Sequence, residues 1–423
     1  MQHAIPVDQL YEKVGSQIED MASAVEACVH CGFCLPTCPT YQVLGEEMDS
    51  PRGRILLMKS VLEDQLSVHE AMPYIDRCLG CLACVTACPS GVQYGSLMSP
   101  FLAYAQDKTE YSVMESAQRL LVRETLPYPN RFRSAAALGR MAQPLRKALP
   151  GELQSLLEML PDALPEEQPL PVIVPPEGRR RARVALLAGC VQQVIAPEIN
   201  WATIRVLAKN GVEVVIPGSQ TCCGAILTHV GDTDGTRRLA RQNLAVMPDD
   251  VDVIVTNAAG CGSGMKEYGS LFHGLDEERK SREFASKVMD VSEFLVQLGM
   301  IAPPPLPISM QAAYHDACHL AHAQGVVDAP RTLLRAIPNL TLCDIEDWET
   351  CCGSAGTYNL EQPEIAAELG RRKVKNIQKS GGEVVVTGNI GCMVQIKKHL
   401  PANEDRPMSV YHTMQVLDIA YQI

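Results

Sequence analysis

Apolar positions follow helical spacing through much of the first 160 residues. The segments SVMESAQRLLVRETL (112–126) and ELQSLLEML (152–160) place apolar residues three and four positions apart, which predicts two helices in a stretch, about 101 to 160, that has no cysteine. The next segment is dense in proline, with Pro161, Pro165, Pro169, Pro171, Pro175 and Pro176. Because proline interrupts a helix, we expect an extended, semi-rigid connector here.

After the connector, short β-branched runs alternate with helical stretches. The runs are residues 212–216, 251–256 and 383–387, and the helical stretches are 199–209, 236–246 and 365–378. This alternation predicts two α/β units with parallel sheets. A second proline break, Pro303 to Pro305, precedes the last segment of the chain.

The two α/β units share a pattern of cysteines, which makes them an internal repeat. Each unit has one cysteine, then an adjacent Cys-Cys-Gly after 31 or 32 residues, then a last cysteine after 37 or 39 more. They are Cys190, Cys222, Cys223 and Cys261 in the first repeat and Cys318, Cys351, Cys352 and Cys392 in the second. We expect these cysteines at strand ends and in the following loops, where α/β folds place their sites.

Composition narrows the class of protein. A chain of 423 residues that is 46% apolar and 20% charged is expected to form two to four globular domains. Lys plus Arg number 37 against 49 Asp plus Glu, a net charge of −12, which argues against binding to nucleic acid or directly to anionic lipid. No run of about 18 apolar residues predicts a membrane span. If the protein works at a membrane, a partner protein or a contact through its own surface would therefore have to hold it there.

The chain has 17 cysteines, an odd number, and its first residues have no basic segment followed by an apolar one. We therefore expect a cytoplasmic protein, peripheral at most on the inner face of the membrane, whose thiols stay free or bind metal.

Eight cysteines form two runs of one kind. They read Cys28-x2-Cys31-x2-Cys34-x3-Cys38-Pro39 and Cys78-x2-Cys81-x2-Cys84-x3-Cys88-Pro89. This is the ligand run of bacterial two-cluster ferredoxins, in which the fourth cysteine binds the other [4Fe–4S] cluster. The prediction is one cluster on Cys28, Cys31, Cys34 and Cys88, and a second on Cys78, Cys81, Cys84 and Cys38. Zinc is the alternative, but a third cysteine at the same interval is surplus in a four-ligand zinc site.

Two such clusters relay single electrons and do not themselves oxidise organic substrates. The segment Gly260-x-Gly262-x-Gly264 lacks the third glycine offset of a dinucleotide fingerprint, and we interpret it as a turn that exposes Cys261. The flavin is therefore expected on another polypeptide.

Between the two cysteine runs, Ser50 before Pro51 is typical of a helix start. Arg52 or Arg54 in the same segment could tune the clusters electrostatically.

The cysteines of the repeats leave several interpretations open. Four thiolates per repeat could bind a further iron–sulfur centre, could line a quinone or protein-docking pocket, or could simply be buried. Cys343 lies outside the pattern and is interpreted as structural. The neighbouring histidines could carry protons or fill ordinary core and surface positions. They are His229, His315, His319 and His322.

With these motifs in view, the chain resembles, almost from end to end, the iron–sulfur subunits of bacterial glycolate oxidase. The segments that carry the likeness are CVHCGFCLPTCPTYQVLGEEMDSPRGRI, CLGCLACVTACPSGVQYG, YHDACHLAHAQGV and CCGSAGTYNL. Iron–sulfur subunits of anaerobic glycerol-3-phosphate dehydrogenase, lactate-utilisation proteins and heterodisulfide reductases are similar in architecture. The repeats here end in Cys261-Gly-Ser-Gly264 and Cys392-Met-Val-Gln395, without the C-x2-C of heterodisulfide reductases.

The resemblance implies an electron-transfer subunit of a 2-hydroxy-acid dehydrogenase complex. One or two FAD-binding partner subunits would oxidise glycolate to glyoxylate, and the clusters of this chain would pass the electrons toward a quinone. Lactate or glycerol 3-phosphate as substrate, a heterodisulfide or thiol reductase, and a zinc scaffold remain alternatives. The expected fold is α+β and α/β. It comprises a two-cluster ferredoxin-type helical domain (1–100), a helical segment with the proline-rich linker (101–180), and two α/β repeats (181–302 and 303–423).

Overall fold

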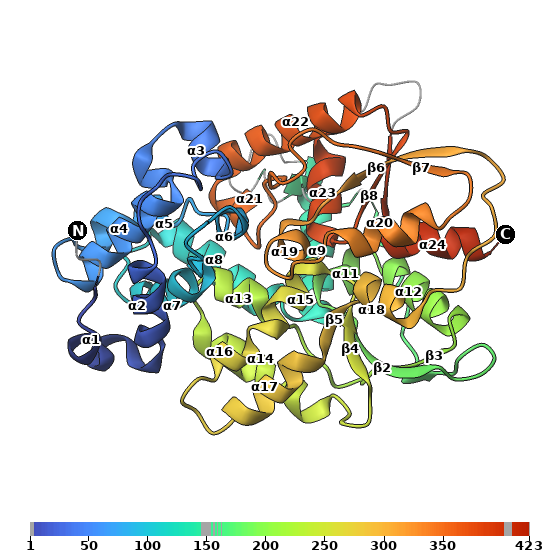
Figure 1. The fold of residues 1–423 in the computed structure, drawn as a ribbon, viewed down its shortest axis with the longest axis horizontal. Coiled ribbons are helices and arrows are strands. Elements are labelled where there is room, and N and C mark those ends of the chain that lie inside the picture. The colour runs from blue at the N-terminus through green and yellow to red at the C-terminus, as the bar shows by residue number, and fades with distance from the viewer. Residues whose placement is uncertain are drawn as a thin grey trace.

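A computed structural model describes residues 4–144, 154, 157–158, 160–161, 163–401 and 408–422. The N-terminal part is a helical lobe at one end of the molecule, drawn in blue in Figure 1. Its elements are α1 (Val7–Val14), η1 (Gly15–Gln17), α2 (Ile18–Glu26), α3 (Pro39–Leu44), η2 (Glu47–Asp49), α4 (Pro51–Leu62), α5 (Val68–Ile75), α6 (Ala83–Thr86) and α7 (Tyr94–Gln106). Apolar side chains of α2, α4, α5 and α7 form its core.

Two further helices, α8 (Val113–Thr125) and α9 (Pro129–Ala142), connect this lobe to the rest of the chain. Ser112 and Glu115 form a capping box at the start of α8, which confirms the helix expected over residues 112–126. Phe132 and Ala136 of α9 pack against Val194 of the first repeat. The helix expected over 152–160 lies largely outside the described residues.

The first repeat forms a five-stranded sheet of order β1-β3-β2-β4-β5. Its elements are β1 (Ile173–Val174), β2 (Ala182–Leu187), α11 (Val191–Ile195), α12 (Glu198–Lys209), β3 (Val212–Val215), α13 (Ala225–His229), α14 (Thr233–Val246), β4 (Val253–Thr256), α15 (Ala259–Lys266), α16 (Tyr268–Leu271), α17 (Glu278–Lys287), β5 (Val288–Asp290) and α18 (Val291–Leu298). β2, β3, β4 and β5 are parallel, whereas β1 is antiparallel to β3. The proline-rich connector therefore supplies an edge strand as well as a link.

The second repeat forms an all-parallel sheet of order β7-β6-β8-β9, the same order as the four parallel strands of the first. Its elements are β6 (Met310–His315), α19 (Cys318–Ala321), α20 (Asp328–Arg335), β7 (Leu340–Cys343), α21 (Tyr358–Glu361), α22 (Pro363–Lys379), β8 (Val384–Thr387), α23 (Ile390–His399), β9 (Ser409–His412) and α24 (Thr413–Tyr421). The strands and helices expected from the alternation are confirmed.

The two repeats pack on each other reciprocally. An early helix of the first, α12, contacts the last helix of the second, α24, while α18 at the end of the first contacts α20 near the start of the second. Apolar side chains from both sheets share one core, and Arg205 of α12 pairs with Asp418 of α24 at 2.6 Å where the two helices meet. Each repeat therefore covers a face that the other would otherwise leave bare.

Two further findings concern expected features. The segment around Cys261 is not an exposing turn: Gly260, Gly262 and Gly264 lie within helix α15, where Gly262 is buried. Gly264 allows α15 to pack closely on α13, because a Cβ there would lie 2.8 Å from the Cβ of Ala225.

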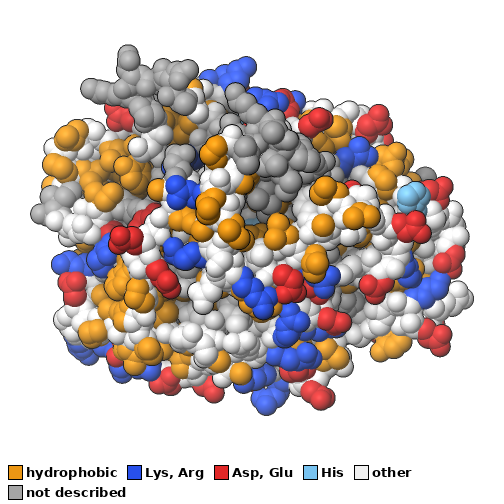
Figure 2. Space-filling view, turned by 180° about the vertical axis from the view of Figure 1, so that it is seen from behind, with side chains coloured by type: hydrophobic (Ala, Val, Ile, Leu, Met, Phe, Trp, Pro, Cys, Tyr) orange, Lys and Arg blue, Asp and Glu red, His pale blue; other side chains and the backbone are white. Residues whose placement is uncertain are grey.

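Within the described part of the chain, no helix is long and apolar enough to cross a membrane. On the face opposite to that of Figure 1, apolar side chains form separate patches among charges of both signs (Figure 2).

Candidate iron–sulfur sites

Two cavities in the helical lobe collect the eight N-terminal cysteines. One is lined by Cys28, Cys31, Cys34 and Cys88, the set that the spacing assigns to the first cluster, and is also touched by Cys84. The other is lined by Cys38, Cys78, Cys81 and Cys84, the set assigned to the second. The fourth cysteine of each run therefore lines the cavity of the other run: Cys38 lies with the second set and Cys88 with the first.

The two cysteine loops have the same backbone shape although their sequences differ. His30 and Gly80 occupy equivalent positions with φ of 54° and 61°, and Gly32 and Leu82 follow with φ of 86° and 60°. Left-handed residues at these positions turn successive N–H groups inward, which suits an anionic cluster. At the second loop the N–H of Gly80 points at the sulfur of Cys78, with a separation of 3.4 Å.

The thiols of these loops are poor candidates for free cysteines. Burial raises the pKa of Cys81 and of Cys84 well above the ordinary value, so neither would ionise near neutral pH by itself. Iron supplies the positive charge that allows such thiols to bind as thiolates. The donor set, its grouping and its inward N–H groups therefore fit two [4Fe–4S] clusters.

Two arginines stand beside the two sets. Arg54, only 1% exposed, places Nη1 3.9 Å from the sulfur of Cys38 and pairs with Asp49 at 3.1 Å. Arg52 donates to the carbonyl oxygen of His30 in the first loop at 3.0 Å and pairs with Glu47. Both lie on α4, whose start is capped by the Ser50 side chain as the sequence predicts.

The first repeat brings its four cysteines to one place, at the carboxyl ends of β2, β3 and β4. The sulfurs of Cys190 and Cys222 lie 3.3 Å apart, and all four side chains line one cavity. Gly224 has φ of 90°, and its N–H points at the sulfur of Cys222 at 3.4 Å. The glycine of the Cys-Cys-Gly segment is therefore required by the backbone conformation.

The second repeat has the same arrangement. The sulfurs of Cys318 and Cys351 are 3.8 Å apart, and Gly353, with φ of 89°, directs its N–H to the sulfur of Cys351 at 3.4 Å. Cys343 ends strand β7 outside this group, where its sulfur lies 3.9 Å from Oε1 of Gln311.

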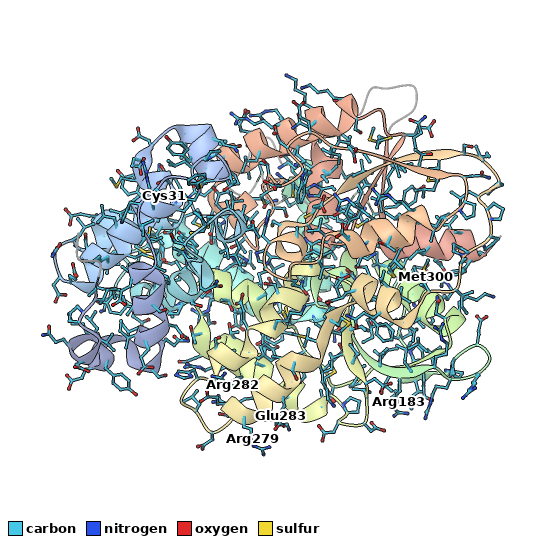
Figure 3. The ribbon with its side chains drawn as sticks, in the orientation of Figure 1. Cys31, Arg183, Arg279, Arg282, Glu283 and Met300 are labelled. Carbon is cyan, nitrogen blue, oxygen red and sulfur yellow. The ribbon has the colours of Figure 1, made fainter. Side chains whose placement is uncertain are left out.

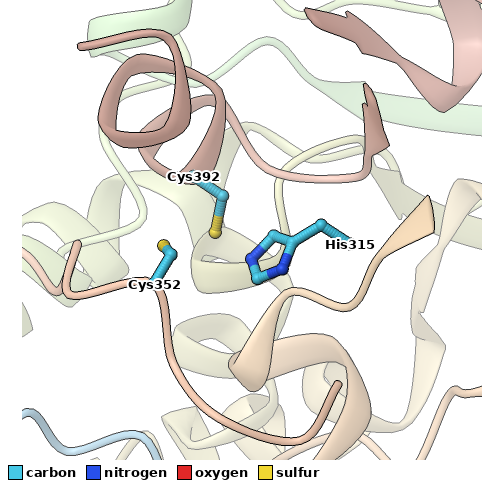
Figure 4. Close-up of side chains that lie close together, drawn as sticks. All are labelled: His315, Cys352 and Cys392. Atoms are coloured by element: carbon cyan, nitrogen blue, oxygen red, sulfur yellow. The ribbon is translucent and has the colours of Figure 1, made fainter. Parts of the chain in front are cut away.

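One residue makes the second repeat different. A ligand atom of His315 and the sulfurs of Cys352 and Cys392 all lie within 4.8 Å of one another, and all three residues are buried. Figure 4 shows the imidazole directed toward the two sulfurs. Neither ring nitrogen has a hydrogen-bond partner in the described structure, and burial, followed by the nearby Lys373 charge, holds the pKa of His315 well below its usual range. A neutral imidazole beside two thiols is a ligand set for zinc or iron.

The other histidines have separate roles. His322 is fixed by bonds to Thr86 Oγ1 at 2.9 Å and to the Glu349 carbonyl oxygen at 3.0 Å. His319 donates to the carbonyl oxygen of Gly80 at 3.0 Å, and its ring stacks on that of His229 with centroids 5.9 Å apart. The second repeat therefore packs directly on the loop that lines the second cysteine cavity.

Several neighbours of the sulfurs carry no signal in the sequence. Lys373, 2% exposed, places its charge near Cys351 and Cys352, and Asn389 donates to the sulfur of Cys392 at 3.4 Å. Tyr94 places its hydroxyl 3.8 Å from the sulfur of Cys78. No motif identifies them: Lys373 and Tyr94 come from other segments of the chain, and Asn389 is the N-cap residue of α23, the helix that contains Cys392.

Comparisons with known proteins agree with this architecture. The 4Fe-4S dicluster domain model matches residues 24–92, and the cysteine-rich CCG domain model matches residues 184–266 and 312–397. The chain is 34% identical over 411 residues, 95% of each chain, to the glycolate oxidase iron–sulfur subunit of Escherichia coli (strain K12). It is 28% identical over 236 residues, 56% of this chain and 98% of the relative, to lactate utilization protein A of Shouchella clausii (strain KSM-K16).

Among solved structures, a hypothetical protein from Helicobacter pylori shares the fold with a TM-score of 0.55 and 9% identity, and the match covers 99% of this chain and 76% of that one. The full-length similarity to the Escherichia coli subunit and the matches to both domain models lead to one assignment. The chain belongs to the family of glycolate oxidase iron–sulfur subunits.

Proposed function

We propose that the chain is the electron-transfer subunit of a flavin-dependent 2-hydroxy-acid dehydrogenase complex that oxidises glycolate to glyoxylate. In this proposal Cys28, Cys31, Cys34 and Cys88 bind one [4Fe–4S] cluster, and Cys38, Cys78, Cys81 and Cys84 bind the other. The observation that carries it is the grouping of these cysteines around two cavities in a chain 34% identical to a glycolate oxidase iron–sulfur subunit. The clusters would supply one-electron chemistry, and FAD would be bound by a partner subunit.

The exposure of the two cysteine sets supports a direction for electron flow. Cys31 is exposed and lies in the helical lobe, across the molecule from Arg183 and Met300 (Figure 3). Val29 and Phe33 beside it are 64% and 66% exposed. Cys81, by contrast, is buried in an apolar cluster with Cys318 and Cys351 of the second repeat. We infer that electrons enter from the flavin partner near Cys31 and leave through the repeats.

A further metal centre is proposed in the second repeat. The buried and unpartnered imidazole of His315, beside Cys352 and Cys392, supports it. The remaining repeat cysteines are proposed as further redox or metal residues. They are Cys190, Cys222, Cys223, Cys261, Cys318 and Cys351.

The proposed complex is cytoplasmic and peripheral to the inner face of the membrane, with a quinone as acceptor. Exposed apolar side chains on α8 and α9 support a membrane contact, with Val113 88% and Met141 78% exposed.

The test is anaerobic co-purification of the chain from its host, followed by dye reduction with glycolate, D-lactate, L-lactate and glycerol 3-phosphate. Glycolate-dependent activity with a co-purified flavoprotein is the expected result. A purified complex without flavoprotein and without hydroxy-acid-dependent activity would contradict the proposal and leave thiol chemistry of the isolated chain as the alternative.

A second candidate substrate is lactate, because the chain is also 28% identical over 236 residues to a lactate utilization protein. The same assay separates the two: activity with lactate and none with glycolate would keep the electron-transfer role and change the substrate.

A further inference from the structure

A large apolar cavity lies between helices α8 and α9 and the two repeats. Its volume is about 670 Å³, within the range of small-molecule sites. The walls are leucines, alanines and other apolar side chains, with glycines, cysteines and a few neutral polar groups. Among its described lining residues there is no Lys, Arg, Asp or Glu. The cavity therefore suits a neutral, mainly apolar molecule and not a hydroxy acid, whose carboxylate would require a cationic partner.

The cavity has two chemically different walls. One is formed by α8 and α9, with Val122, Phe132 and Ala136 among the apolar side chains that face it. Another part of the lining carries cysteines of both repeats, including Cys223 and Cys261 from the first and Cys392 from the second. An occupant would therefore lie with an apolar body against the helices and a redox-active group near the sulfurs.

Two histidines connect this cavity with the second cysteine loop. His229 and His319 both line it, and His319 donates to the carbonyl oxygen of Gly80, the residue between Leu79 and Cys81. His229 stacks on His319 but has no hydrogen bond among the described residues, so its ring can donate to a ligand. One end of the cavity is thus one hydrogen bond away from a loop that the proposed function assigns to a cluster.

The cavity also reaches the protein surface, at α8 and α9. Leu121 of α8 and Leu138 of α9 line the cavity and are nevertheless 41% and 68% exposed. Leu120 and Met141 extend this exposed apolar surface along the same helices, at 60% and 78%. A long apolar chain could therefore continue from the cavity along α8 and α9 into a lipid surface.

We propose that this cavity is the binding site of an isoprenoid quinone, with the ring near His229 and His319 and the tail between α8 and α9. The reaction there would convert the two ring carbonyls of the quinone to hydroxyls, with two electrons from the chain's clusters and two protons from solvent. This inference rests on the proposed function, which supplies the electrons.

The test combines direct binding with turnover. An azido-ubiquinone photoprobe is added to the full chain, and labelled peptides are mapped with and without competing decylubiquinone. Ala135→Trp fills the cavity from α9, and Ala137→Trp, an exposed neighbour that does not line the cavity, is the matched control. His229→Leu removes the ring N–H while leaving the cavity apolar.

We expect competed labelling of peptides from α9 or from residues 225–229. In the complex with its flavin partner, Ala135→Trp should lower the ratio of decylubiquinone to dye turnover at least tenfold, and His229→Leu should raise the KM for the quinone. Ala137→Trp should leave both values unchanged. Labelling confined to the helical lobe, or a ratio unaffected by Ala135→Trp in a folded protein, overturns the proposal. A complex that reduces no dye with any hydroxy acid would contradict the proposed function alone, because photolabelling of the chain does not depend on it.

Discussion

Leu187 and His315 occupy the same position in the two repeats. Each is the last residue of the first parallel strand, and each pairs with a threonine that ends the third, Thr256 for Leu187 and Thr387 for His315. In one repeat the position contributes to an apolar core, whereas in the other it places an imidazole beside two sulfurs. Two units with one topology therefore have different chemistry, and the substitution at this position provides a direct test.

His315→Leu places the residue of the first repeat in the second. If His315 is a metal ligand, the iron or zinc content per chain should fall, while the spectra of the N-terminal clusters persist. His69→Leu removes an exposed histidine of the helical lobe, outside the second repeat, and is the control. If the variant contains as much metal as the unaltered chain, His315 is not a metal ligand and its side chain only packs in the core. The measurement is elemental analysis of anaerobically purified protein.

Arg54→Gln should lower the reduction potential of the cluster assigned to Cys38. The Arg54 guanidinium lies 3.9 Å from that sulfur and is buried, so its charge favours the reduced, more negative cluster. The shift should amount to tens of millivolts, since about 59 mV corresponds to a tenfold change for one electron. Redox titration followed by electron paramagnetic resonance measures it.

The conservative variant Arg54→Lys retains the charge and should restore much of the potential. Arg52→Gln is the matched comparison, because Arg52 contacts the other loop and should affect the other cluster. An unchanged potential in folded Arg54→Gln would limit Arg54 to its pairing with Asp49.

Cys84→Ser should prevent electron transfer from substrate to quinone by removing a ligand of the second cluster. Reduction of the partner's flavin by glycolate should continue, because the flavin lies upstream in the proposed path. Rapid-mixing absorbance of the flavin separates the two steps. Loss of flavin reduction as well would contradict a pure relay role. Cys343→Ser is the control, since Cys343 lies outside the sulfur groups.

Phe33→Asp should weaken association with the flavin partner. Phe33 is 66% exposed beside the exposed Cys31, where a charge would be unfavourable in an apolar interface. Ile308→Asp changes a residue that is 77% exposed and far away along the chain, and it should have no effect. Anaerobic co-purification yields compare the two. Equal recovery of the flavoprotein with both variants would place the partner elsewhere.

Asp76 should make stability depend on pH. Burial raises the pKa of Asp76 to about 6, although the Arg119 guanidinium 3.8 Å away opposes the shift. Because the folded-state pKa lies above the ordinary value near 4, the contribution to stability is complete below about pH 4 and is lost as the pH rises through about 6. Asp76→Asn should therefore raise stability at about pH 7.5, by about 1–2 kcal/mol, and less at about pH 5.

Thermal unfolding of the cluster-loaded protein at both pH values measures this difference. Asp107→Asn, an exposed aspartate at the end of α7, should show no pH-dependent gain. A gain for Asp76→Asn that is the same at both pH values would point to packing and not to ionisation.

Local patterns predicted much of this molecule. Motif spacing predicts how the N-terminal cysteines are grouped. Short-range periodicity predicts the strand at Val253–Thr256 and the helix at Pro363–Lys379. Contacts between distant segments were not predictable in this way. Gly80 and His319 are separated by 239 positions, and only the packing of the second repeat on the helical lobe brings them together. The glycines of α15 favour a turn when only their neighbours in sequence are considered, but in the structure they lie in a helix, where Gly264 allows close packing on α13.

The reciprocal contacts of α12 with α24 and of α18 with α20 resemble the interface of a twofold dimer, contained here within a single polypeptide. Tethering makes the association of the two halves intramolecular, so it does not weaken on dilution. The cavity, whose sulfur-bearing wall draws on both halves, is therefore completed whenever one chain folds. A protein with a single such repeat would need a second copy, or another chain, to build the same wall.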